Sequence, residues 1–288
     1  MRLSSSIFWA APAAVLAASL ATGCGAADKA SEKAAADRIP GLVTLVKDDV
    51  AQVRKGLPEG AEKLGKLVGP DVGNDLVALQ RSIASARAGV KDLELAKSTF
   101  FTFVDTTGTS LRSEADPDLL ATHNVFAALP ELKKSVEPNS KVVEAFGDLK
   151  EVHIRAGNDF TWAAAAPVKD DKGDVKGAFV TGWTLRGLAY HLEEMTKREV
   201  LEAAKQAGTK SVPVVYVFVL HGKKAYGAGQ TPEVNTKAVE DLDLLTKAAG
   251  GPVRGLVEIT GRTFGYAAAR TTDEYAPDTG VAVLASEI

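Results

Sequence analysis

The sequence predicts an α+β fold in which two five-stranded antiparallel sheets, each with helices on one face, follow an N-terminal helical segment. Between residues 39 and 57 apolar side chains recur alternately four and three positions apart, which is typical of an amphipathic helix. Beyond residue 98 the pattern changes to short β-branched and aromatic runs separated by turns. An order of two strands, helices and three further strands then occurs twice, so we expect two similar units.

The extreme N-terminus has the pattern of an export signal. Arg2 supplies a short positive start, and residues 7–21 form an apolar stretch too short to span a bilayer. The small residues Ala21-Thr22-Gly23 then precede Cys24. This arrangement resembles a bacterial lipoprotein signal, in which the cysteine is acylated and becomes the new N-terminus, although Ala21 stands where that pattern more often has leucine. An ordinary signal peptide with an incidental cysteine is the alternative.

The lipoprotein resemblance has consequences for compartment and stability. We expect residues 1–23 to be removed and Cys24 to carry lipid that anchors the protein to the cell envelope, facing the periplasm. Gly25 supplies no aspartate retention signal, which favours the outer membrane by resemblance to lipoprotein sorting. Because Cys24 is the only cysteine, no disulfide is expected. The small and polar residues 24–36 are expected to act as a tether.

Residues 37–98 are expected to be a helical region with two interruptions. Pro58-Glu59-Gly60 and Gly69-Pro70 are predicted breaks, and a second helix is predicted from about Asn74. Both helices have an apolar stripe. The stripes can pack as a hairpin on the protein's own domain or serve dimerisation, and their short length favours the hairpin.

The first repeated unit is expected within residues 99–206. Its predicted strands, in chain order, are residues 100–104, 110–112, 150–155, 160–168 and 175–184. Residues 118–136 are predicted to be helical with a break at Pro130, and residues 185–206 form an exit helix.

The second unit is expected within residues 207–288. Its predicted strands are residues 214–220, 225–227, 256–259, 263–272 and 280–285, with a helix over residues 233–249. The two units also share residues. Phe160-Thr161-Trp162-Ala163-Ala164-Ala165 matches Phe264-Gly265-Tyr266-Ala267-Ala268-Ala269, Val152 and Ile154 match Val257 and Ile259, and Phe103-Val104 matches Phe218-Val219. We interpret this agreement as a duplication.

Several motifs in the first unit resemble the Cache family of PAS-like extracellular ligand-sensing domains. They are Phe103-Val104-Asp105-Thr106-Thr107-Gly108, Ala166-Pro167-Val168-Lys169-Asp170-Asp171-Lys172-Gly173 and Gly177-Ala178-Phe179-Val180. A long helix over residues 74–98, entering the first strand, is similar to that family. The resemblance implies tandem Cache units in which sheet and helical cap enclose a small molecule. This sequence departs from receptors of the family because we find no transmembrane helix and no output module.

The candidate ligand-binding residues of the first unit are two aromatic and three polar side chains. They are Trp162, Trp183, Arg155, His123 and Asn124. An arginine can hold a carboxylate through paired hydrogen bonds, and tryptophans can cover an apolar or cationic group. The alternative is that both tryptophans belong to the core. The corresponding candidates of the second unit are Tyr216, Tyr226, Arg262, Tyr266 and Arg270.

Motifs typical of catalysis are weak in this sequence. Residues 60–66 have the glycine and lysine spacing of a phosphate-binding loop, but Leu67 stands in place of the required serine or threonine. The four histidines are scattered, and the aspartates at 170, 171 and 174 lack the spacing of a calcium loop. We therefore expect no enzyme activity, no metal and no cofactor.

The function predicted from the sequence is that of a lipid-anchored extracytoplasmic sensory or small-molecule-binding protein without an output domain of its own. The alternative is a structural or adaptor lipoprotein that grips another envelope protein through the helical region and the PAS-like folds. The expected partners are the membrane through the lipid, a small organic ligand and an envelope protein. Dimerisation is open, and the formal net charge of −3 gives no reason to expect nucleic acid.

Overall fold

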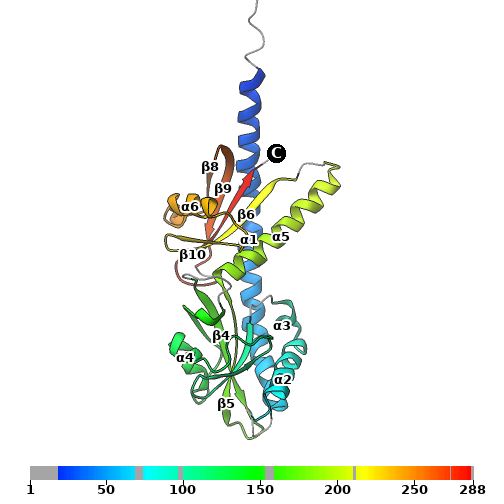
Figure 1. Ribbon diagram of the computed structural model, residues 1–288, viewed down its shortest axis with the longest axis vertical. Helices are drawn as coiled ribbons and strands as arrows, with labels where there is room; N and C mark the ends of the chain where they lie inside the picture. Colours follow the sequence, from blue (N-terminus) through cyan, green and yellow to red (C-terminus); the bar gives the residue numbers. More distant parts are fainter. Residues whose placement is uncertain are drawn as a thin grey trace, which may run out of the picture.

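One long helix at the N-terminal end packs against both sheets of the molecule. The computed structural model describes residues 19–68, 74–96, 100–152, 159–209, 212–272 and 274–286. Within these ranges α1 runs from Ser19 to Leu67, and both sheets are arranged along it (Figure 1). None of the helices in these ranges combines the length and the apolar character that a membrane crossing requires.

The remaining elements form two units that follow each other along α1. The first unit contains α2 (Leu76–Ala88), α3 (Lys91–Leu95), β1 (Phe100–Asp105), β2 (Ser110–Ser113), α4 (Val125–Ala128), the 3-10 helix η1 (Pro130–Val136), β3 (Val143–Gly147), the 3-10 helix η2 (Lys150–Val152), β4 (Thr161–Lys169) and β5 (Val175–Thr184). Helix α5 (Leu185–Gln206) leads to the second unit. That unit contains β6 (Val214–His221), β7 (Lys224–Gly227), α6 (Glu233–Asp241), α7 (Leu244–Lys247), the 3-10 helix η3 (Ala248–Gly250), β8 (Val253–Ile259), β9 (Arg262–Arg270) and β10 (Thr279–Ser286).

The two sheets have the same topology. The strand order is β2-β1-β5-β4-β3 in the first and β7-β6-β10-β9-β8 in the second, with every neighbouring pair antiparallel. The predicted fold class is therefore confirmed, with two five-stranded PAS-like sheets after an N-terminal helical segment.

Each sheet is covered by helices on both faces. In the first unit α4 and η1 pack on one face through side chains such as Phe126 and Leu132. In the second unit α6 and α7 do the same through Val239, Leu244 and Leu245. The opposite face of both sheets packs on the apolar seam of α1. The short connecting helices thus lie on one face, as predicted, and α1 adds a second layer.

Helix α1 begins earlier and ends later than the sequence indicates. The expected tether, residues 24–36, is helical, and Ala35 within it is fully buried. The expected break at Pro58 is also absent. A proline inside a helix costs about 3 kcal/mol, but Leu57, Ala61 and Leu64 continue the buried seam past it, and burial of such side chains outweighs that cost.

The helix predicted from residue 74 is divided into two, and the first residue of its apolar stripe is not buried. It consists of α2 and α3, which are separated at Gly89, and Leu76 at its start is exposed. Leu79, Ile83 and Leu93 pack on α1 in the common core, so the two stripes form a hairpin within the chain.

The third strand of the first unit lies elsewhere than predicted. It is β3, whereas residues 150–152 form the 3-10 helix η2 and residues 153–158 lie outside the described ranges. The prediction of a strand over residues 150–155 was therefore wrong for residues 150–152, and its remainder lies outside the described ranges. The helix predicted over residues 118–136 consists only of α4 and η1, and that over residues 233–249 is interrupted at Asp243, whose φ is 47°.

The repeat holds for the order of elements but not for the matched residues. Ala164 faces α1, whereas its match Ala268 faces α6 and α7. Phe103 and Phe218 differ in the same way. Side chains alternate between the faces of a strand, so a shift of one residue reverses the face. The sequence matches therefore join positions that are not structurally equivalent.

Candidate functional site

The two candidate tryptophans belong to the core. Trp162 and Trp183 are direct cross-strand partners on β4 and β5, with ring centroids 4.9 Å apart. Both are almost fully buried on the face that packs on α1. The indole N–H of Trp162 donates to Glu144 at 3.2 Å. Neither side chain lines either of the two hollows described below.

The polar candidates lie on a different side of the sheet. Asn124 is the N-cap of α4, where its side chain accepts from the backbone N–H of Ala127 at 2.8 Å and donates to the carbonyl of Thr107 at 3.1 Å. His123 is half exposed, with Nδ1 3.2 Å from Glu151. Arg155 lies outside the described ranges. The described members of the expected cluster are not brought together, because the tryptophans face α1 while α4 covers the opposite face.

The second-unit candidates are mostly in structural roles. Tyr216 and Tyr266 pack beside the core under α6 and α7. Arg262 donates to the hydroxyl of Ser286 at 2.8 Å, and Arg270 donates twice to the carbonyl of Leu245. Tyr226 is different, because it lines a pocket.

This pocket, here called the junction pocket, lies where the end of the first sheet meets β7 and α6. Its volume is about 770 Å³, which is within the range of small-molecule sites. The lining residues come from both units and from α5. They are Phe160, Arg186, His221, Lys224, Ala225, Tyr226, Gly227, Ala228, Thr231, Glu233, Thr236, Lys237 and Glu240.

An ion pair between a partly exposed arginine and a buried aspartate lies at one wall of the junction pocket. Arg186 is in the first turn of α5, which begins directly after β5 and is capped by the hydroxyl of Thr184. Its Nε lies 3.7 Å from Oδ2 of Asp159, which is 1% exposed. The guanidinium also lies over the ring of Tyr226, 5.9 Å from the centroid. The position of Arg186 is thus defined by a buried anion and an aromatic face.

Tyr226 remains a neutral phenol over the physiological pH range. Burial raises its pKa to about 12, and the negative charge of Asp159 adds to this increase while Arg186 opposes it. The hydroxyl therefore retains its proton and is a potential hydrogen-bond donor next to Arg186.

The floor of the junction pocket is aromatic. Phe160 and His221 have ring centroids 4.7 Å apart, and Phe146 contacts both at 5.4 and 5.0 Å. Burial lowers the pKa of His221, and Asp278 opposes this only in part, so the imidazole is mainly uncharged at neutral pH. This wall is suited to an apolar or planar part of a ligand.

The rim carries an ion pair between Lys224 and Glu240. Glu240 accepts from the backbone N–H of Ala225 at 3.3 Å and from Lys224 at 3.4 Å. The lining residues offer no nucleophile hydrogen-bonded to a base, and no group of three or more metal-ligating side chains occurs in the described part of the chain. The arrangement can bind and orient a small molecule.

Sequence reasoning missed Arg186 and Asp159. Asp159 immediately precedes the predicted fourth strand and Arg186 is the second residue after the fifth, so both lie at the same end of the first sheet. The antiparallel pairing of these two predicted strands was a signal that could have placed the two residues together.

Comparisons with known proteins concern the fold only. No family model matches the chain, and no curated protein matches it. Among solved structures, a domain of a sensory box/GGDEF family protein from Vibrio parahaemolyticus is similar with a TM-score of 0.49 and 10% identity, covering 89% of this chain and 97% of that one. The periplasmic domain of Vibrio cholerae LuxQ has a TM-score of 0.46 and 12% identity, covering 85% and 97%.

A longer protein is similar over part of its length. It is an extracellular ligand binding receptor from Desulfohalobium retbaense, with a TM-score of 0.44 and 11% identity, covering 86% of this chain. The chain spans 40% of the length of that receptor.

Proposed function

We propose that this protein is a lipid-anchored, extracytoplasmic binding module of the sensory type, and that its ligand is a small carboxylate held in the junction pocket. The observation that carries the proposal is the position of Arg186. Its guanidinium lines the pocket between a buried aspartate and the neutral phenol of Tyr226.

The chemistry of the walls defines the class of ligand. A guanidinium can bind a carboxylate through two parallel hydrogen bonds, and a phenol can add a third. The aromatic floor of Phe160 and His221 would contact an apolar or flat body. A ligand of this kind would bury its apolar part against these rings, and its carboxylate would be paired with the guanidinium of Arg186.

A binding screen tests the proposal. Purified protein is screened by thermal shift with amino acids, aliphatic and aromatic carboxylates, and amines, and hits are measured by calorimetry. We expect a carboxylate to stabilise the protein and its amide not to do so. Arg186→Lys keeps the charge but loses the paired geometry, so affinity should fall by about tenfold or more.

Arg198→Lys is the matched control, because Arg198 is exposed further along the same helix. It should leave affinity unchanged. If no compound stabilises the protein, or if Arg186→Lys binds the hit as tightly as wild type, the proposal fails. The adaptor function, in which the folds grip another envelope protein, would then be the better explanation.

Anchoring is tested separately at Cys24. We propose that this residue is acylated after removal of residues 1–23 and that the outer membrane is the destination. Metabolic labelling with a fatty acid, followed by mass spectrometry of the N-terminal peptide, should detect the modification in wild type and not in Cys24→Ser. An unmodified Cys24 in membrane fractions would contradict this part of the proposal.

A further inference from the structure

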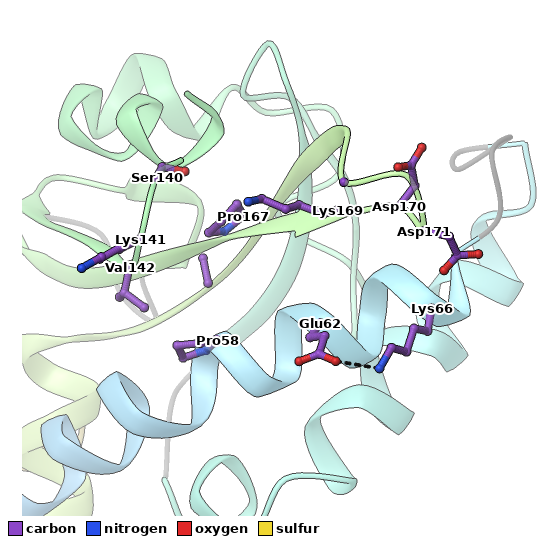
Figure 2. A pocket seen from close by; sticks show the side chains of 12 residues that line it. Pro58, Glu62, Lys66, Ser140, Lys141, Val142, Pro167, Lys169, Asp170 and Asp171 are labelled. Atoms are coloured by element: carbon purple, nitrogen blue, oxygen red, sulfur yellow. Dashed lines mark hydrogen bonds and ion pairs between the residues drawn. The ribbon is translucent and has the colours of Figure 1, made fainter. Parts of the chain in front are cut away.

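A second hollow lies at the far end of the first unit, away from the junction pocket. Its volume is about 830 Å³. We call it the distal groove, and Figure 2 shows it between the last turns of α1 and the first sheet. Its lining residues are Pro58, Glu62, Lys66, Ser140, Lys141, Val142, Ala166, Pro167, Lys169, Asp170, Asp171 and Gly173.

The distal groove exists because two strands diverge. β3 pairs with β4 only as far as the Val143–Ala165 pair. Beyond that point, β4 continues through Lys169 with β5 as its only strand partner. The outer edge of this part of β4 therefore faces the groove, but the backbone carbonyl of Lys169 packs against Gly65 of α1 and is not open to an added chain. Pro167 has no N–H, so carbonyl acceptors predominate there.

Charges of opposite sign are separated along the groove. Figure 2 shows Lys141 at one end and Asp171 at the other, with the side chain of Lys169 directed toward Pro167. The side-chain amino groups of Lys141 and Lys169 form no hydrogen bond or ion pair with another described residue. Asp170 is occupied, since it accepts from two backbone N–H groups and from Lys176. The half of the groove near Lys141 thus carries two lysine amino groups that pair with no other described side chain.

The middle of the groove is apolar. Pro58 on α1 lies opposite Val142 and Pro167 (Figure 2). On the helix side, Lys66 forms an ion pair with Glu62, with Nζ and Oε1 2.6 Å apart, and also interacts electrostatically with Asp171. The surface presents, in order, positive charge, an apolar section and negative charge.

We propose that the distal groove binds a short peptide with free termini, its carboxylate at Lys141 and Lys169, its body against Pro58 and Pro167, and its amino group at Asp171. An extended peptide would place its two terminal charges at opposite ends of the groove, each beside side chains of the opposite charge. The site is separate from the junction pocket and shares none of its residues.

The test uses purified protein and tetraalanine in three forms, namely free, N-acetylated and C-amidated, with binding followed by calorimetry. We expect the free peptide to bind about tenfold more tightly than either blocked form, since charge-assisted hydrogen bonds are lost in each. In Lys141→Gln/Lys169→Gln, the free and C-amidated peptides should bind equally. In Asp171→Asn, the free and N-acetylated peptides should bind equally.

Lys172→Gln is the matched control, because Lys172 is exposed in the same hairpin but does not line the groove. It should bind all three peptides as wild type does. The variants alter exposed side chains, and equal melting temperatures would show that the fold is retained. The proposal is overturned if the free peptide does not bind, if the variants do not change the ranking, or if Arg186→Lys abolishes binding.

Discussion

The close approach of α1 to the second sheet makes Gly265 a sensitive position. A Cβ atom at residue 265 would lie 2.2 Å from the carbonyl group of Ser31 and 2.3 Å from the backbone nitrogen of Glu32, both in α1. Carbon atoms pack best about 3.5–4.0 Å apart. Gly265→Ala therefore requires the helix and β9 to separate by more than 1 Å, since backbone atoms cannot rotate away.

The expected decrease in the free energy of unfolding is the difference between two opposing effects. Overpacking costs about 1–3 kcal/mol, and contact with backbone on the other side places this case near 3 kcal/mol. Loss of glycine's freedom in the unfolded chain returns up to about 1 kcal/mol. The net decrease in the free energy of unfolding is about 2 kcal/mol, which corresponds to a melting temperature lower by about 4–8 °C.

The assay is urea unfolding followed by far-UV circular dichroism, with Gly41→Ala as the control. Gly41 lies in the same helix, and a Cβ atom there would meet nothing within 4 Å. That substitution should raise the free energy of unfolding by about 0.5–1 kcal/mol. If Gly265→Ala is as stable as wild type while Gly41→Ala behaves as expected, α1 does not lie against β9 as described.

Three further perturbations test the structure. Arg54 of α1 and Glu144 of β3 form two hydrogen bonds, of 2.6 and 2.9 Å. A double-mutant cycle with Arg54→Met and Glu144→Gln should therefore give a coupling energy of about 0.5–1 kcal/mol. A coupling energy near zero would contradict the contact. Asn124→Ala should cost about 1 kcal/mol through loss of the α4 cap and leave ligand affinity unchanged, so a large fall in affinity would show that Asn124 contacts ligand. Burial raises the pKa of Tyr226 from about 10, the value of an exposed phenol, to about 12 in the folded protein. The folded state therefore favours the neutral phenol, and the stability that this side chain contributes is present below pH 10 and is lost as the pH rises toward about 12. Tyr226→Phe should therefore weaken the decline in unfolding free energy over that interval, and an unchanged pH profile would refute the assignment.

The sequence was a good guide to features governed by local pattern. The exit helix was predicted over residues 185–206 and has these bounds, because its apolar stripe and the following Gly208 are local signals. Strands β1, β5 and β10 were placed within two residues, since each is a continuous run rich in β-branched, aromatic and other apolar residues. The doubled topology could likewise be predicted from the order of these runs.

Features governed by tertiary contact were not accessible in this way. Pro58 predicts a break unless the sheet that covers Leu57 and Leu64 is known. β3 is only five residues long and half-buried, so its pattern is weak beside the apolar run near Val152. The junction pocket depends on how the end of β4 meets β7, which no local pattern encodes.

The arrangement of α1 also determines the order in which the molecule can be completed. Its first half, around Ser31 and Ala35, packs on β9 and β10, which are the last strands of the chain. Contacts of such long sequence separation form slowly. During synthesis the apolar residues of this half of α1 are made first, and they stay exposed until β9 and β10 have been synthesised. The nascent chain is therefore vulnerable to aggregation until that point. A truncation after α5 would leave that seam exposed permanently, so the two sheets cannot be separated into independent domains by a single cut.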